Sequence, residues 1–529
     1  HKIESNKKDY LINFLIIFGI FLFQFISFFP FVNETSALLA ADPYYWTENV
    51  LYLNNYGLIN TEIMGPKYPW GFVIYCSGNL LGFQDFGISY YFMKFSFFPF
   101  IMIYSLIMFS ISQRLFKSKF ATFFCLLLII SQSYFIYRVI QFISSSLAIL
   151  LIFLSFVVLL TDIPNYFLGI ILSTIFLTNP VYSFFFILAL GIFYLIKMII
   201  SYKTYKIILK EIIQVMILSI ICLIVYVYSV IVIYNQDLFT IIKSFIEGFN
   251  TGLSITLSSF IGSFQPYQLI IINILLEGLY VIFFSVLPVI SIIFLIKNRK
   301  VTVNNDFNLF LIICVILVGI FVLILPHFLY SRLILIFYNR IAEAFLPSIV
   351  ILAGYSLRWL SLLFKKIKEK INLTFFKNNR KTQRNNSKLR DSKRFYIIMC
   401  IGISLLMLNH FYARENVYID YRWDDSIIDC IFYIQNNIEK ESNIAINEND
   451  ETFSPNNLLF DYELYLIPTN ISLTFSEFIN FTEGNSIEYL VINLSFYNEN
   501  FTIEFQNSTS FYKLTSGNLS TDFNLYEVS

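Results

Sequence analysis

The chain repeats runs of about 20 apolar residues, the length that a helix needs to cross the hydrocarbon core of a bilayer. Short polar or basic segments separate these runs. Only 13% of the 529 residues are charged, whereas a soluble protein carries about twice that share. The pattern predicts a polytopic α-helical membrane protein. Because 36 Lys+Arg balance 35 Asp+Glu, no basic surface is expected, and a nucleic-acid-binding protein is excluded.

Eleven runs are expected to be transmembrane helices. They cover residues 11–32, 88–112, 120–137, 142–160, 166–177, 181–200, 212–234, 269–296, 307–325, 342–360 and 395–411. Lys and Arg concentrate in cytoplasmic loops, and basic residues follow the second, sixth, eighth and tenth runs, with 13 in the segment 358–394. This loop and the N-terminus are therefore predicted to be cytoplasmic. The apolar stretch 70–83 is too short and glycine-rich to cross comfortably.

The first long loop, 33–87, is predicted to lie on the opposite, extracytoplasmic side. The transmembrane domain is predicted to cover residues 1–411, and everything after it is also predicted to be extracytoplasmic. The segment 412–529 has 19 Asp/Glu against four Lys/Arg and is predicted to be a separate small α/β domain. A helix is expected to begin after Asp424, because isoleucines recur there at helical spacing. Strands are expected at residues 443–446, 471–475, 488–492, 501–505 and 511–514.

Asn-x-Ser/Thr sequons are frequent in this last segment. Composition alone predicts about three, whereas six are present, and they begin at Asn470, Asn480, Asn493, Asn500, Asn507 and Asn518. These asparagines are candidates for N-glycosylation if the domain faces a glycosylating compartment. The alternative is that these asparagines reflect only the Asn-rich composition of the segment and carry no glycan.

Carboxylates in the outer loops are the first candidates for chemistry, since ionisable residues at a membrane are costly and rare. Asp42 lies in the first outer loop beside Pro43 and three aromatic residues, where it could serve as a general base or a metal ligand. Glu48 is a second candidate catalytic carboxylate, and Glu247, after the seventh run, is a candidate metal ligand. The alternatives are a helix N-cap at Asp42, with Pro43 at the first helical position, and a solvated loop acid at Glu247.

Three arginines on the same side form the second group of candidates. Arg138 follows the third run, and Arg332 and Arg340 precede the tenth. The forked guanidinium suits a phosphate, so these residues predict a site for an anionic lipid head group. Snorkelling of the side chains, or pairing with nearby glutamates, is the alternative for each.

The order and sidedness of several motifs resemble the GT-C superfamily of polytopic glycosyltransferases. The matching motifs are Ala41-Asp42-Pro43-Tyr44-Tyr45, Tyr68-Pro69-Trp70-Gly71, Leu177-Thr178-Asn179-Pro180 and Asn339-Arg340. The resemblance implies transfer of a sugar from a polyprenyl-phosphate or diphosphate carrier to a glycan, lipid or protein acceptor, with inversion at the anomeric carbon. Asp42 would then take the acceptor proton, while Arg340, Arg138 and Arg332 hold the lipid phosphate.

Asp-Pro-Tyr-Tyr most resembles the oligosaccharyltransferase catalytic subunit. That resemblance implies Mg²⁺ or Mn²⁺ held by Asp42 and Glu247, whereas otherwise no cofactor is expected. The Trp-Trp-Asp-Tyr-Gly motif of that subunit is absent, and Tyr421-Arg422-Trp423-Asp424-Asp425 stands near its place. A relative with another acceptor is therefore favoured over protein N-glycosylation. A flippase or transporter of lipid-linked glycans is a third hypothesis.

Overall fold

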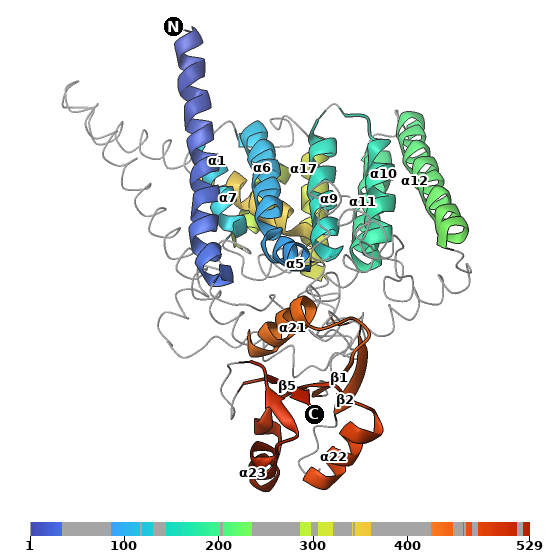
Figure 1. Cartoon of the computed structure of the whole chain (residues 1–529). Coiled ribbons are helices and arrows are strands. Elements are labelled where there is room, and N and C mark those ends of the chain that lie inside the picture. Colours follow the sequence, from blue (N-terminus) through green and yellow to red (C-terminus); the bar gives the residue numbers. More distant parts are fainter. Residues whose placement is uncertain are drawn as a thin grey trace, which may run out of the picture.

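The structure is a computed structural model with two parts, a bundle of apolar helices and a C-terminal unit built on a β-sheet (Figure 1). It describes residues 2–33, 86–116, 119–130, 144–161, 163–200, 205–234, 286–297, 305–320, 341, 344–360, 425–447, 459, 462–467, 474–515 and 522–529. The C-terminal unit lies beyond one end of the bundle, which we call the domain end. The opposite end is the far end.

The bundle helices follow the predicted apolar runs. They are α1 (Lys2–Asn33), α5 (Phe86–Phe95), α6 (Phe97–Phe116), α7 (Lys119–Ile130), α9 (Ser144–Leu160), α10 (Phe167–Thr178), α11 (Pro180–Ile200), α12 (Tyr205–Tyr234), α16 (Leu287–Lys297), α17 (Asn305–Gly319) and the helix Ala344–Leu360. Among the described residues, three stretches are long and apolar enough to cross a membrane: Tyr90–Phe116, Val181–Ile200 and Tyr205–Ile224. The helical architecture is therefore as predicted.

The number of spans remains a prediction. The eleventh run, 395–411, lies outside the described residues, as do the basic segment 358–394 and the predicted domain boundary at residue 412. The third and eighth runs are described over only part of their predicted length, in α7 and α16.

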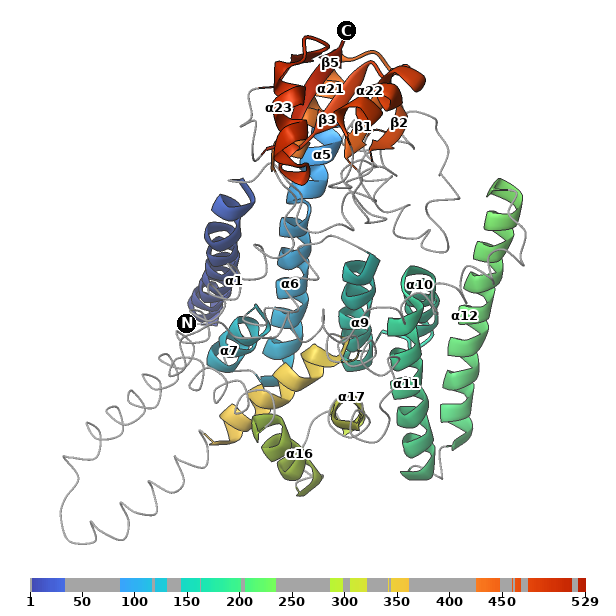
Figure 2. The same ribbon diagram turned by 90° about the horizontal axis from the view of Figure 1, so that it is seen from below.

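The second predicted span is a broken helix, because Ser96 separates α5 from α6. Pro99, in the first turn of α6, has no N–H to donate to the carbonyl group of Phe95, and its ring would clash with that carbonyl in a continuous helix. Ser96 still donates its backbone N–H to the carbonyl oxygen of Phe92 at 2.9 Å. The short helix α5 is thus a distinct element at the domain end (Figure 2).

Helices α10 and α12 pack closely because small residues lie at their contact. A Cβ atom at Gly169 would lie 2.5 Å from the carbonyl oxygen of Val215, so a larger residue would force the helices apart. The Ser219 hydroxyl donates to the carbonyl oxygen of Gly169 at 3.0 Å. Small residues and interhelical hydrogen bonds are common at contacts between membrane helices. On the other side of α12, Ile217 and Ile224 are exposed, as expected for a lipid-facing surface.

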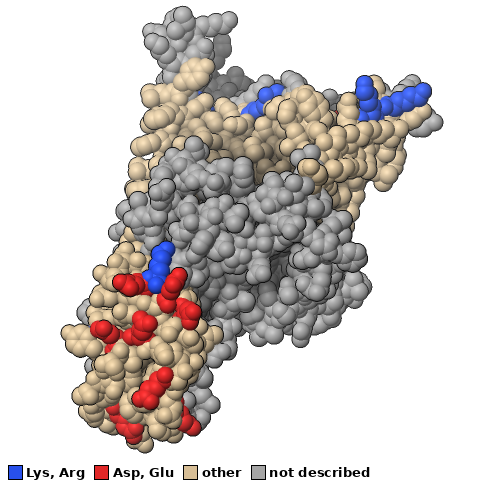
Figure 3. All heavy atoms as spheres, turned by 45° about the vertical axis from the view of Figure 1, so that its right-hand side comes forward, with Lys and Arg blue, Asp and Glu red and all other residues tan. Residues whose placement is uncertain are grey.

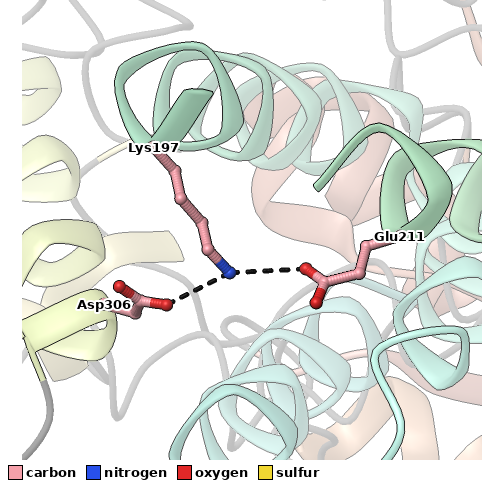
Figure 4. Close-up of polar contacts among 3 residues, drawn as sticks. All are labelled: Lys197, Glu211 and Asp306. Atoms are coloured by element: carbon pink, nitrogen blue, oxygen red, sulfur yellow. Dashed lines mark hydrogen bonds and ion pairs between the residues drawn. The ribbon is translucent and has the colours of Figure 1, made fainter. Parts of the chain in front are cut away.

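An ion triad joins three helices at the far end (Figure 4). The Nζ atom of Lys197 in α11 lies 3.3 Å from Oε2 of Glu211 in α12 and 3.1 Å from Oδ2 of Asp306 in α17. The side chain of Lys197 is 17% exposed, whereas that of Asp306 is 62% exposed. The triad therefore lies at the rim of the bundle, where solvent limits its contribution to stability.

The C-terminal unit is a mixed sheet of five strands in the order β2-β1-β3-β5-β4. The strands are β1 (Asn443–Asn447), β2 (Glu463–Ile467), β3 (Tyr489–Ile492), β4 (Phe511–Lys513) and β5 (Asn524–Val528). Strand β1 is parallel to both β2 and β3, whereas β5 is antiparallel to β3 and β4. The predicted α/β character of the unit is therefore observed.

Helices cover both faces of this sheet (Figure 1). Helix α21 (Asp425–Asn437) packs on the face that includes Ile444 and Ile446 of β1. Helices α22 (Phe475–Gly484) and α23 (Glu499–Asn507) pack on the other face, around Leu490 and Ile492 of β3. The alternation of side chains along each strand gives the unit two apolar cores.

A fully buried polar side chain, Asn447, connects the ends of β1 and β3. Its amide donates a hydrogen bond to the hydroxyl of Tyr497 at 2.7 Å, and its Oδ1 atom accepts the backbone N–H of Asn493, also at 2.7 Å. Burial raises the pKa of Tyr497 to about 12, so its phenol is neutral at physiological pH. Asn447 thus satisfies two polar groups in the interior.

The predicted strand 501–505 is helical, since it lies within α23. The predicted strand 471–475 lies outside the described residues except for Thr474 and Phe475, and Phe475 begins α22. The prediction for 501–505 is wrong because capping residues outweigh the apolar alternation. Thr474 and Glu477 form a capping box at the start of α22, and the Asn498 side chain accepts the N–H of Phe501 at the start of α23.

Charge separates along the molecule. Asp and Glu side chains predominate on the C-terminal unit in the view of Figure 3, where a basic side chain also occurs, and the other Lys and Arg side chains in this view lie on the bundle. Lys206 and Lys210, at the start of α12, are exposed at the far end. This distribution matches the loop-charge argument. The orientation of the termini across the membrane remains a prediction.

Candidate active site

The residues predicted to carry the chemistry lie in the segments that connect the helices. Asp42, Glu48, Arg138, Arg332, Arg340 and Glu247 are all outside the described residues. The flanking helices nevertheless alternate in direction, and α6 packs on α7, α9 on α10 and α11 on α12. This order puts the described ends of the flanking helices at the domain end, where α5 also lies (Figure 2). The position of the predicted site residues themselves remains a prediction.

The first outer loop runs from the end of α1 to the start of α5, and α1 packs on α6, the helix that follows α5. Asn33 ends α1 and Phe86 begins α5, so the loop that carries Asp42 leaves and rejoins the bundle at these points. Between α1 and α6, the amide of Gln24 donates to the Ser105 hydroxyl at 3.5 Å. The rings of Phe25 and Phe98 lie 5.3 Å apart between centroids. These contacts hold α1, after which the predicted catalytic loop begins, against α6.

A set of polar contacts lies at the turn between α10 and α11 and between α6 and α9. The Asn179 amide donates to the Ser145 hydroxyl of α9 at 3.3 Å, and the Tyr104 hydroxyl of α6 donates to the carbonyl oxygen of Ser146. Ser145 and Ser146 are buried. The motif Leu177-Thr178-Asn179-Pro180, quoted for the resemblance, therefore has a structural role, because it ties the α10–α11 turn to α9.

The C-terminal unit rests on α5 through three aromatic residues. The ring centroid of Phe432, in α21, lies 5.0 Å from that of Tyr90 and 6.1 Å from that of Tyr91, with Tyr90 in an edge-to-face arrangement. Tyr90 is 1% exposed and belongs to the core between α21 and the sheet. We call Tyr90, Tyr91 and Phe432 the aromatic clamp. It fixes the C-terminal unit to the helix at which the first outer loop rejoins the bundle.

Lys94 is a residue of this region that the sequence analysis missed. It lies one turn beyond Tyr90 and Tyr91 in α5 and is only 7% exposed. Its Nζ atom lies 5.9 Å from the ring centroid of Tyr91 and 5.8 Å from that of Phe95. The sequence could have drawn attention to Lys94, because it is a charged residue inside the predicted apolar run 88–112, where charged residues are rare.

The sequons of the C-terminal unit differ in accessibility. Asn480 in α22 and Asn500 and Asn507 in α23 are exposed. Asn493 is 4% exposed, and its Oδ1 atom accepts both the backbone N–H and the hydroxyl hydrogen of Ser495. The folded domain therefore cannot accept a glycan at Asn493. Asn470 and Asn518 lie outside the described residues.

No group of three or more His, Cys, Asp or Glu side chains that could hold a metal ion occurs among the described residues. The predicted ligands Asp42 and Glu247 are outside that part of the chain. A Mg²⁺ or Mn²⁺ site at these two carboxylates therefore stays a prediction.

Comparison with known proteins identifies the fold. No family model and no curated protein sequence matches the chain. The Archaeoglobus fulgidus oligosaccharyltransferase AglB, in complex with an inhibitory peptide and a dolichol-phosphate, matches 99% of this chain and 74% of its own, with 12% identity and a TM-score of 0.50. The Archaeoglobus fulgidus oligosaccharyltransferase tethered to an acceptor peptide containing the NVT sequon matches 98% of this chain and 74% of its own, with 11% identity and a TM-score of 0.53.

ArnT from Cupriavidus metallidurans, bound to undecaprenyl phosphate, matches 97% of this chain and 97% of its own, with 12% identity and a TM-score of 0.52. At these identities the likeness is one of fold. The chain therefore shares its fold with the archaeal oligosaccharyltransferase and with ArnT, in agreement with the fold that the resemblance implies.

Proposed function

We propose that the chain is a membrane glycosyltransferase that moves a sugar from a polyprenyl-phosphate or diphosphate carrier to an acceptor at the domain end. The observation that carries this proposal is the fold. It matches, over 97% or more of this chain, one enzyme solved with a dolichol-phosphate and another solved with undecaprenyl phosphate. The order of the motifs around Asp42 and Arg340 supports the same conclusion.

In the proposed mechanism, Asp42 accepts the proton of the attacking group of the acceptor, with Glu48 as a second carboxylate of the same loop. Arg340, with Arg138 and Arg332, binds the lipid phosphate and stabilises the charge that develops on it as it leaves. A single displacement inverts the anomeric carbon. A divalent metal, if Asp42 and Glu247 hold one, would supply further charge stabilisation at the phosphate.

One observation favours an acceptor other than a protein sequon. The motif Trp-Trp-Asp-Tyr-Gly, which the resemblance to oligosaccharyltransferases implies, is absent from the sequence. Oligosaccharyl transfer to asparagine is the second candidate, supported by Asp42-Pro43-Tyr44-Tyr45 and by the fold of the Archaeoglobus enzyme.

A lipid-linked glycan transporter is disfavoured by the position of charge. Transporters place polar residues and interrupted helices near the middle of the membrane. Here, among the described bundle residues, Lys94 lies near the domain end and the triad of Lys197, Glu211 and Asp306 lies at the far end. The break between α5 and α6 is also near the domain end rather than central.

Replacing Asp42 by Asn tests the mechanism in the full chain reconstituted with polyprenyl-phosphate-linked sugars. Asn can still cap a helix but cannot accept the proton, so transfer should fall about a hundredfold or more with little change in the thermal midpoint. Glu504→Gln, at an exposed site in α23, is the matched control and should leave transfer unchanged. Full activity of Asp42→Asn would contradict the assignment. Sugar movement across the membrane without transfer would favour the transporter.

The predicted topology has a separate test. A Cys introduced at Asn507, in α23, should react with a membrane-impermeant thiol reagent in intact cells, because the C-terminal unit is proposed to be extracytoplasmic. A Cys at Asn379, in the basic segment 358–394, should not. The reverse labelling would place the proposed site on the cytoplasmic side.

A further inference from the structure

The outer face of α12 carries a regular pattern of charge and apolar side chains. Figure 1 and Figure 2 both show α12 at the edge of the bundle, where it packs on α10 and α11. Away from these contacts, exposed residues recur at alternating spacings of four and three, which places them on one face of the helix. We call this set the α12 stripe, and it consists of Lys206, Lys210, Ile213, Ile217, Ile220 and Ile224.

The end of the stripe nearest the far end is positively charged. Lys206 and Lys210 lie one turn apart, and both are exposed. The neighbouring carboxylate of Glu211 pairs with Lys197 instead, and neither Lys206 nor Lys210 has an ion pair within the described part of the chain. Lysines at a cytoplasmic helix end serve topology on any face of the helix. Here both lie on the face of the isoleucines, so their charges suit one anionic group at the membrane surface.

The apolar part of the stripe has the length of one membrane leaflet. Ile220 follows Lys210 by ten residues, which is about 15 Å along a helix. One leaflet of the hydrocarbon core is also about 15 Å thick. The exposed fractions of Ile213, Ile217 and Ile220 are 45%, 52% and 50%. An acyl chain whose head group contacts Lys210 can therefore lie along these three side chains through its leaflet.

The residue types on the two sides of α12 distinguish a lipid from a second helix. Membrane helices approach each other closely through small residues, and the side of α12 that packs on α10 has Ser219 against Gly169. The α12 stripe contains no Gly, Ala, Ser or Thr. The stripe therefore lacks the residues that let another helix approach closely, whereas flexible acyl chains adapt to a surface of branched side chains.

We propose that the α12 stripe binds an anionic phospholipid of the leaflet at the far end, with its phosphate at the two lysines and an acyl chain along the isoleucines. Each ammonium group acts as a point charge toward the phosphate. The inference is independent of the proposed function, because the lipid-linked donor is proposed to bind at the domain end. It adds a second lipid site, selective for charge, at the opposite end of the bundle.

Native mass spectrometry of the purified full chain in detergent micelles tests the charge selectivity. Dioleoyl phosphatidylglycerol is the anionic probe and dioleoyl phosphatidylcholine the zwitterionic one, and the wild type should bind the anionic probe more tightly. Combining Lys206→Gln with Lys210→Gln should weaken phosphatidylglycerol binding about 25-fold, or about fivefold for each lysine, and leave phosphatidylcholine binding unchanged. Lys440→Gln, at an exposed lysine of the C-terminal unit, is the matched control and should bind both lipids as the wild type does. Equal binding of the two lipids by the wild type, or unchanged phosphatidylglycerol binding by the double variant, would overturn the inference.

Photo-crosslinking in bilayers of these two lipids tests the apolar part of the stripe. Ile217→p-benzoylphenylalanine should crosslink to lipid, with phosphatidylglycerol enriched over its share of the bilayer, and glutamine at both lysines should abolish the enrichment. The same substitution at Ile187, an exposed residue of α11, is the control and should crosslink the two lipids in their bulk ratio. A covalent dimer of the chain as the main product at Ile217 would show that a second copy covers this face and would overturn the inference.

Discussion

Replacing Asn447 by Ala should strongly destabilise the C-terminal unit. The substitution leaves two buried groups without a partner, the Tyr497 hydroxyl and the backbone N–H of Asn493, which now bond to Asn447 at 2.7 Å each. An unsatisfied buried polar group costs about 1–3 kcal/mol, so the free energy of unfolding should fall by about 2–6 kcal/mol. Tyr497→Phe leaves only the Asn447 amide unpaired and should cost about half as much.

Resistance to proteolysis in increasing urea measures this stability in the full chain, since cleavage reports the population of the unfolded unit. Asn436, exposed on α21, provides the control, and Asn436→Ala should change stability by less than about 0.5 kcal/mol. The expected order of loss is Asn447→Ala, then Tyr497→Phe, then Asn436→Ala. Equal midpoints for Asn447→Ala and Asn436→Ala would refute the argument that these two bonds stabilise the sheet.

Gly169→Leu should separate α10 from α12 and lower the thermal midpoint, because even a Cβ atom would lie 2.5 Å from the Val215 carbonyl oxygen; an unchanged midpoint would contradict this packing. Hydrogen bonds from Thr474 hold the pKa of the Glu477 carboxyl below its ordinary value, so its contribution to stability is lost as pH falls through that lowered pKa. Wild type should therefore lose more urea resistance on acidification than Glu477→Gln does. Lys197→Met leaves two carboxylates unpaired and should lower the thermal midpoint, which Glu211→Gln should partly restore.

The bundle could be predicted from sequence because its helices follow the length and hydrophobicity of the apolar runs. Helices α11 and α12 contain runs that are continuous and bounded by polar segments, and the structure agrees with the predicted spans there. The break at Ser96 could also have been predicted, since Pro99 lies inside the second run. A hydropathy average over the run combines Pro99 with its apolar neighbours and therefore does not show the break.

The C-terminal unit was harder to predict because two signals compete within short segments. Phe501, Ile503 and Phe505 alternate as in a strand, yet they form part of α23, where Asn498 caps the first turn. Strand β5 is a strand although its local sequence does not favour one, since Asn524 and Glu527 are poor strand formers. Its pairing with both β3 and β4 supplies the stabilisation that the local sequence lacks.

The candidate site could be predicted only as residue types in loops on one side of the membrane. Sequence patterns indicated Asp42 and Arg340. They could not indicate that Phe432 contacts Tyr91 of α5, because the two residues are more than 300 positions apart in the sequence. Lys94 was overlooked because it lies in an apolar run, where its burial depends on tertiary packing. Contacts between distant segments follow from the fold and not from local pattern.

The ion triad of the far end has a consequence for how the chain enters the membrane during synthesis. Lys197 and Glu211 lie on consecutive helices joined by the short segment 201–204, so they can pair as soon as this hairpin has been inserted. Asp306 is synthesised 95 residues after Glu211. The pair is therefore available on α11 and α12 before α17 is made, and Asp306 then gives α17 a charged contact with Lys197. Assembly of this part of the bundle would follow the order of translation.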